Sequence, residues 1–117
     1  ASTAACPAFS AAVAVGDVVY VSCWHPDQVL TLHVHHAAPS LTPGWTQRVD
    51  VPGGLIAAYG AIWVVASSSG TLEALDPSTG NVRFSVTGGS APHFATPAAA
   101  DGHVYAVLGG RLVAVAA

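Results

Sequence analysis

Histidine is the residue type in this chain whose clustering most directly indicates chemistry. Six histidines occur among 117 residues, and His33, His35 and His36 stand close together. On an extended strand His33 and His35 point to the same face, where their imidazole nitrogens could chelate one metal ion such as zinc. His25, and Cys23 if it is reduced, could complete that ligand set. The competing interpretation is structural, with the rings packed between elements and bonded to backbone carbonyls or water. We favour it, because a single His-x-His pattern is common, and we expect no cofactor.

The two cysteines, Cys6 and Cys23, offer either a disulfide or thiol chemistry. A nucleophilic thiol needs a base beside it, and no histidine or asparagine stands at a spacing that identifies one. If residues 8–15 and 18–23 form a hairpin, Cys6 lies beyond the start of one strand and Cys23 at the end of the other, which favours a bridge. We expect a structural disulfide and an extracellular or periplasmic location, since disulfides persist in oxidising compartments.

The segment Asp76-Pro77-Ser78-Thr79-Gly80 resembles a cation or phosphate loop only superficially. It carries one acid where calcium loops carry several, and its residue types are those of an ordinary turn. Asp76 and Gly80 are therefore predicted to be turn residues. The run Ser67-Ser68-Ser69-Gly70 lacks the Gly-x-Ser-x-Gly pattern of a nucleophile elbow. These patterns identify no catalytic residue, and the chain is more consistent with a non-enzyme.

Composition excludes several classes of protein. Hydrophobic residues make up 52% of the chain and charged residues 8%, which excludes a disordered chain. The net charge is −3, with only three cationic side chains, so no basic surface is available to bind nucleic acid. Every apolar run is shorter than the roughly 18–20 residues of a membrane helix, which excludes membrane insertion.

An internal repeat organises the chain. Gly16, Gly60 and Gly102 stand 44 and then 42 residues apart, each between two apolar runs. A β-branched residue and then an aromatic one follow each glycine, in the pairs Val19-Tyr20, Ile62-Trp63 and Val104-Tyr105. The runs are short, rich in Val, Ile and Ala, and cut by Gly, Asp, Pro and Ser, which predicts strands and tight turns.

Four antiparallel strands in about 42 residues is the size of a β-propeller blade. We therefore expect an all-β chain that forms a single partial propeller. Blade one covers residues 8–51, blade two residues 52–93, and blade three residues 94–117, which lacks its outer strand.

The segment from Gly70 to Phe84, with Leu72, Ala74-Leu75-Asp76 and Thr79-Gly80 in place, resembles the quinoprotein-type (PQQ-like) propeller repeat, G-x-L-x-A-L-D-x-x-T-G-x-x-x-W. The resemblance implies about two and three-quarter blades. Phe84 and Trp45 would occupy the usual Trp position of their blades. The inner-strand aromatics that would pack one blade on the next are Tyr20, Trp63 and Tyr105. Quinoprotein dehydrogenases hold their cofactor against a disulfide of adjacent cysteines, and this chain has no adjacent cysteines.

A ring of about four to eight blades hides the edges and faces that fewer blades would expose. Three arrangements remain open. These are the C-terminal part of a longer propeller, a small subunit that closes a ring with copies of itself, and a segment completed by a different chain or by stacking into a filament. Residues 3–9 could supply a strand that completes the last blade.

The sequence thus predicts a non-catalytic, exported scaffold or protein-interaction module that acts in an oligomeric or multi-chain assembly. Its partners would be copies of itself or another propeller segment, bound through loops at the blade ends such as 24–30, 36–46 and 87–96. The alternative is a C-terminal fragment of a larger propeller enzyme or sensor, whose active site lies in the missing blades.

Overall fold

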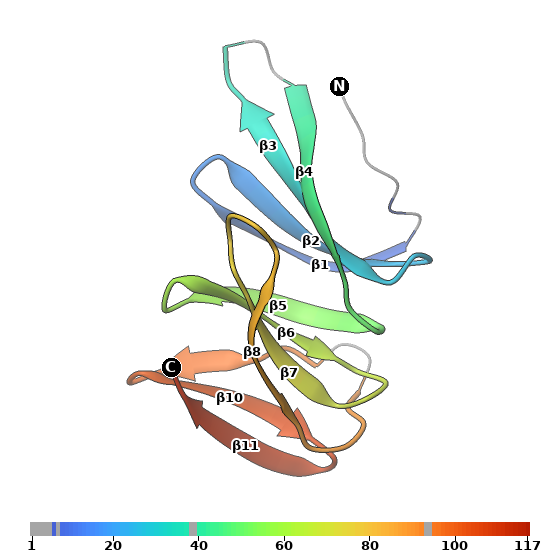
Figure 1. The fold of residues 1–117 in the computed structure, drawn as a ribbon, viewed down its shortest axis with the longest axis vertical. Coiled ribbons are helices and arrows are strands. Elements are labelled where there is room, and N and C mark those ends of the chain that lie inside the picture. The colour runs from blue at the N-terminus through green and yellow to red at the C-terminus, as the bar shows by residue number, and fades with distance from the viewer. Residues whose placement is uncertain (1–5, 7, 38–39, 93–94) are drawn as a thin grey trace.

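A computed structural model describes residues 6, 8–37, 40–92 and 95–117. All regular structure in these residues is β, which confirms the predicted all-β class. The described part of the chain contains no helix that could span a membrane. Three antiparallel sheets follow one another along the chain and are stacked along the long axis of the molecule (Figure 1). In the described residues the three sheets form an open stack and not a closed ring.

Each sheet is a meander in which every strand pairs with its neighbour in sequence. The first sheet contains β1 (Ala8–Val15), β2 (Val18–Trp24), β3 (Gln28–His35) and β4 (Ser40–Arg48). The second sheet contains β5 (Pro52–Ala58), β6 (Ala61–Ala66), β7 (Thr71–Leu75) and β8 (Val82–Thr87). The third sheet contains β9 (Ala98–Ala100), β10 (His103–Leu108) and β11 (Arg111–Ala116).

Two-residue hairpins begin the second and third sheets. The turn between β5 and β6 has φ of +52° at Tyr59 and +71° at Gly60. The turn between β9 and β10 repeats it, with +52° at Asp101 and +75° at Gly102. Two left-handed residues in succession are the signature of a type I′ turn, whose twist matches that of the flanking strands. Glycine is therefore required at the second turn position.

The first sheet departs from this pattern. Its hairpin turns at Gly16 and Asp17, so Gly16 occupies the first turn position and corresponds to Tyr59, not to Gly60. The alignment of the three glycines is therefore wrong by one residue in the first copy. In the observed register the repeated aromatics are in step at intervals of 43 and 42 residues: Tyr20, Trp63 and Tyr105.

Strand β6 lies at the centre of the molecule, and all six of its residues are buried. Ile62, Val64 and Ala66 belong to the core between the first and second sheets. Ala61, Trp63 and Val65 alternate with them and belong to the core between the second and third sheets. Both faces of the strand are covered, which explains why the segment is apolar at every position instead of at every second one.

The sheets stack with a constant polarity. We call the face that carries Tyr20, Trp63 or Tyr105 the forward face of its sheet and the opposite face the rear face. The forward face of the first sheet packs on the rear face of the second, and the forward face of the second packs on the rear face of the third. No sheet of the described chain covers the forward face of the third sheet or the rear face of the first.

The start of the chain joins the first sheet. Ala8 pairs with Trp24 and Phe9 with Cys23, so both residues belong to β1. The predicted closing strand over residues 3–9 is therefore wrong at these two positions, because they already have a partner strand. Cys6 is bonded to Cys23 of the same sheet. Residues 3–5 and 7 lie outside the described part of the chain.

Candidate functional site

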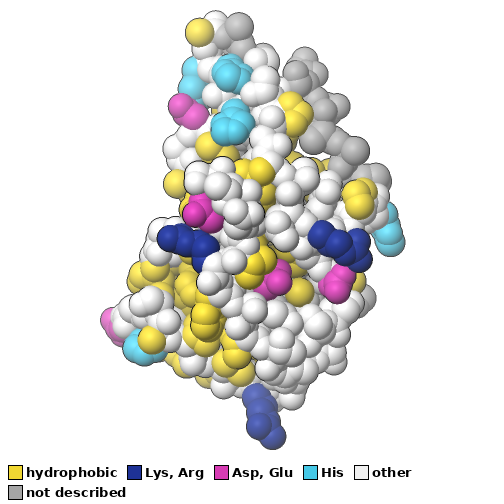
Figure 2. All heavy atoms as spheres, viewed as in Figure 1, with side chains coloured by type: hydrophobic (Ala, Val, Ile, Leu, Met, Phe, Trp, Pro, Cys, Tyr) yellow, Lys and Arg dark blue, Asp and Glu magenta, His cyan; other side chains and the backbone are white. Residues whose placement is uncertain are grey.

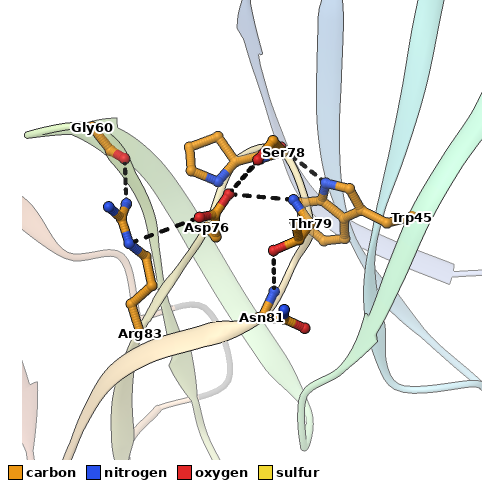
Figure 3. A network of polar contacts seen from close by, with 8 residues as sticks. Trp45, Gly60, Asp76, Ser78, Thr79, Asn81 and Arg83 are labelled. Atoms are coloured by element: carbon orange, nitrogen blue, oxygen red, sulfur yellow. Dashed lines mark hydrogen bonds and ion pairs between the residues drawn. The ribbon is translucent and has the colours of Figure 1, made fainter.

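The most developed polar site joins the first sheet to the second. The Tyr20 hydroxyl and the Trp45 indole Nε1–H both donate to the Pro77 carbonyl oxygen, at 3.3 and 2.9 Å. Pro77 lies in the turn between β7 and β8, so side chains of two strands of one sheet meet a single atom of the next. Figure 3 shows Trp45 lying against this turn. The two rings are 5.9 Å apart between centroids. Burial, and then the charge of Asp76, raises the pKa of the Tyr20 hydroxyl, which therefore remains a donor.

Gly80 receives the flat face of Trp45. Its φ is +79°, and a Cβ at this position would overlap the Trp45 ring. Only glycine combines this backbone conformation with so close an approach. The glycine of the Asp76–Gly80 turn is thus explained by a neighbouring sheet and not by the turn alone.

Asp76 closes the turn on which Trp45 rests. Its Oδ1 accepts hydrogen bonds from the Ser78 hydroxyl at 2.6 Å, the Ser78 amide at 2.8 Å and the Thr79 amide at 3.3 Å. The Ser78 hydroxyl, followed by these amides and the Arg83 charge, lowers the pKa of the Asp76 carboxyl. Arg83 also donates to the Gly60 carbonyl at 2.7 Å. The carboxylate is occupied by its own turn, as an ordinary turn residue would be.

A groove of about 310 Å³ runs beside this contact. Its lining polar groups are largely committed to the protein: the Thr31 hydroxyl donates to the Trp45 carbonyl at 3.1 Å, and the Ser78 hydroxyl bonds Asp76. The exposed His33 ring also lines the groove. The arrangement is suited to holding two sheets in register, because its hydroxyl groups already bond acceptors of the protein.

The second and third sheets meet through a different set of groups. Trp63 and Phe84 pack edge to face with centroids 6.3 Å apart, and the Trp63 indole donates to Ala58 within its own sheet at 2.9 Å. A pocket of about 210 Å³ lies where these rings face Ala116 and Ala117. In the strand register Ala117 corresponds to Pro77, so the second interface makes its contact at the same position of the repeat as the first. Phe84, which replaces Trp45 there, has no group that could donate a hydrogen bond.

The histidines that the structure describes do not assemble as a metal site. His33 and His35 are exposed on β3, while His25 lies in the turn at the opposite end of that strand. His35 bonds the Thr42 hydroxyl at 2.7 Å, and His36 bonds Asp17 at 2.8 Å. Figure 2 shows the histidines near the upper end of the molecule apart from those lower down. Within the described residues, no group of three or more His, Cys, Asp or Glu could hold a metal ion. The predicted grouping of His25 with His33 and His35 is wrong, because β3 separates them.

The predicted disulfide is present. Cys6 and Cys23 are bonded, with their Cα atoms 5.4 Å apart, and Cys23 is fully buried on the rear face of the first sheet. Cys23 is therefore not a thiolate ligand. The bond fixes the entry to β1 against the end of β2.

Several contacts between sheets were not predicted from the sequence. The Trp24 indole donates to the Pro52 carbonyl at 2.8 Å, and Asp27 accepts from the Val51 amide at 3.1 Å. In the next interface the Tyr59 hydroxyl accepts from the Gly102 amide at 2.9 Å. Each contact joins residues more than twenty positions apart, so no local sequence pattern predicts it. The only available signal was the tendency of buried Trp and Tyr to satisfy their polar atoms.

Glu73 is an ionisable residue in an unfavourable position at the interface between the first and second sheets. It is half-buried on the rear face of β7, and its Oε1 is buried with no hydrogen-bond partner in the described structure. Burial, and then the charge of Asp50, raises the pKa of the Glu73 carboxyl. A carboxylate oxygen that is buried without a hydrogen bond is costly, so this side chain weakens the packing of the first sheet on the second.

No protein-family model matches the chain, and no curated protein matches it by sequence. The fold and its contacts define an all-β protein of three stacked antiparallel sheets with one disulfide bond.

Proposed function

We propose that the three sheets are successive blades of a β-propeller of the PQQ-like type, and that the chain is a non-catalytic scaffold or protein-interaction module in a multi-chain assembly. The carrying observation is the constant polarity of the stack, in which a forward face meets a rear face at both interfaces. Propeller blades are related by repetition of one interface, so a repeated polarity is what such a fold requires.

The docking contact supports the same proposal. Trp45 and Tyr20 meet the Asp76–Gly80 turn of the following sheet, and Phe84 and Trp63 face the corresponding residues, Ala116 and Ala117. These aromatics stand at the positions at which the PQQ-like resemblance expects the blade-packing residues. A structural role explains the burial of Tyr20 and Trp63 without any substrate.

The exposed face of the third sheet supports an assembly. Val107 is 47% exposed and Leu112 is 72% exposed, and both lie on its forward face. Their equivalents in the second sheet, Val65 and Leu72, are fully buried. An apolar face that is buried in one copy and bare in the next is typical of a surface awaiting a partner.

Export is part of the proposal. The buried Cys6–Cys23 disulfide agrees with an oxidising compartment, which points to an extracellular or periplasmic location. The alternative, that these blades belong to a larger propeller enzyme or sensor, draws on the same bare face, because additional blades of a longer chain would cover it equally well.

The native mass of the purified chain, measured by size-exclusion chromatography with light scattering beside an intact mass spectrum, tests the assembly. We expect a discrete multiple of the 11.7 kDa chain mass. A monodisperse monomer that does not bind an apolar dye such as ANS would overturn the proposal. A monomer that binds the dye strongly would favour the larger propeller over the self-contained scaffold.

A further inference from the structure

The forward face of the third sheet is an unusually uniform apolar surface. Its side chains come from alternating positions of three strands: Ala98, Ala100, Tyr105, Val107, Leu112 and Ala114. None of these six side chains is charged, and the exposed His103 lies on the same face of β10.

The rear face of the first sheet has matching chemistry. Val19, Val21 and Leu32 lie on it, at the positions that Ile62, Val64 and Leu75 hold in the second sheet. The second-sheet residues form the surface that receives Tyr20. These three residues are half-buried instead of fully buried. Leu30 and the disulfide-bonded Cys23, on the same face, are already buried within the chain, and Arg48 lies at the end of that face.

The molecule contains a contact between a forward face and a rear face twice, and both contacts have the same direction along the chain. Tyr20 packs against a rear face carrying Ile62, Val64 and Leu75, and Trp63 packs against a rear face carrying Val104 and Ala106. Neither interface joins two forward faces. Tyr105 is the third aromatic of this series, and the remaining rear face is that of the first sheet.

We propose that the forward face of the third sheet binds the rear face of the first sheet in a second copy of this chain, head to tail. The inference rests on the proposed function and names its partner. Two copies related in this way carry two identical contacts, and about six sheets are within the number that closes a propeller ring. Tyr105 of each copy would then lie against Val19, Val21 and Leu32 of the other.

Two substitutions block the two faces separately. Leu112→Asp places a carboxylate on the forward face of the third sheet, and Val21→Asp places one on the rear face of the first. A carboxylate buried without a partner should raise the apparent dissociation constant about 100-fold or more. We expect each variant alone to run as a monomer in light scattering. Mixed in equal amounts, the two variants should recover a dimer, because one contact between unmodified faces remains.

Val82→Asp is the matched control. Val82 is an apolar residue 42% exposed on β8, away from both faces, so the same change in charge should leave the native mass unchanged. Circular dichroism and the unfolding midpoint of each variant establish that it is folded. For any variant that does not fold, the milder changes Leu112→Ser and Val21→Ser replace it, with the same order of effects.

The outcomes separate this inference from the proposed function. A dimer of the Val21→Asp variant alone would indicate that two forward faces meet, which overturns the head-to-tail contact. A wild-type multiple that neither substitution disturbs would also overturn it, while the scaffold proposal survives. A wild-type monomer without apolar dye binding would overturn both.

Discussion

The two interfaces between the sheets are built from equivalent strands, yet they are held together differently. At the first interface Tyr20 and Trp45 both bond the Pro77 carbonyl, and Trp24 bonds Pro52. At the second interface the Trp63 indole turns back to its own sheet, and the polar contact comes from Tyr59, whose hydroxyl accepts from the Gly102 amide. Both interfaces have an apolar core, but the first is anchored by the indoles of Trp24 and Trp45 and the Tyr20 hydroxyl, whereas the second is anchored at the hairpin turn that carries Tyr59. One repeat can therefore conserve its packing while it changes its polar anchors.

The largest expected effect is at the second interface. Trp63 is 4% exposed and belongs to the core between the second and third sheets. Trp63→Ala should lower the free energy of unfolding by about 3–5 kcal/mol, because a large cavity remains. Urea unfolding followed by circular dichroism measures it. Phe84→Ala, at a ring that is 43% exposed, should cost clearly less; an equal loss would show that this interface does not depend on the buried indole.

Gly80→Ala tests how closely the first interface is fitted. The new Cβ would overlap the Trp45 ring and would occupy a left-handed backbone position, which together should cost about 1–3 kcal/mol. Gly16→Ala is the control, since its φ is also positive but nothing lies within 4 Å of its added Cβ. If both substitutions destabilise the chain equally, backbone strain alone accounts for the effect and the ring contact contributes nothing.

Trp45→Phe removes the indole donor at the first interface and makes it chemically like the second. We expect a loss of about 0.5–1.5 kcal/mol, the usual net value of one hydrogen bond, since Tyr20 still donates to Pro77. The measurement is again the urea midpoint. The variant should also bring the two interfaces closer in stability, and no change at all would mean that the 2.9 Å contact is not stabilising.

The smallest effect concerns pH. The folded state holds the Glu73 proton more tightly than the unfolded chain does, because burial raises its pKa. Stability should therefore fall as pH rises from the ordinary carboxylic range through the raised value. Glu73→Gln should remove that slope and, after solvent screening of this half-exposed group, stabilise the protein at pH 7 by about 0.5 kcal/mol. Unfolding curves at pH 4 and pH 7 test the sign: a larger gain at pH 4 would contradict it.

The sequence predicted the strands, the hairpins, the disulfide and the all-β class, because all of them depend on neighbouring residues and residue type. The alignment of Gly16 with Gly60 and Gly102 was wrong by one position, because the first copy has its glycine at the first turn position instead of the second. The flanking strands are unchanged. His25 and the pair His33 and His35 were grouped by proximity in sequence, although a whole strand separates them. The Pro77 acceptor and the unpaired oxygen of Glu73 depend on which sheet lies opposite, and that information is not local.

The meander topology has a kinetic consequence. Every strand pairs only with its sequence neighbours, so the contacts within each sheet join residues that are close in sequence and the contact order is low. Low contact order favours rapid formation of each sheet, with docking between sheets as the later step. The middle sheet is stabilised by interfaces with two neighbours and each end sheet by an interface with one, as in a linear array of repeats. We therefore expect hydrogen exchange to be slowest in β6 and to quicken towards both ends of the stack.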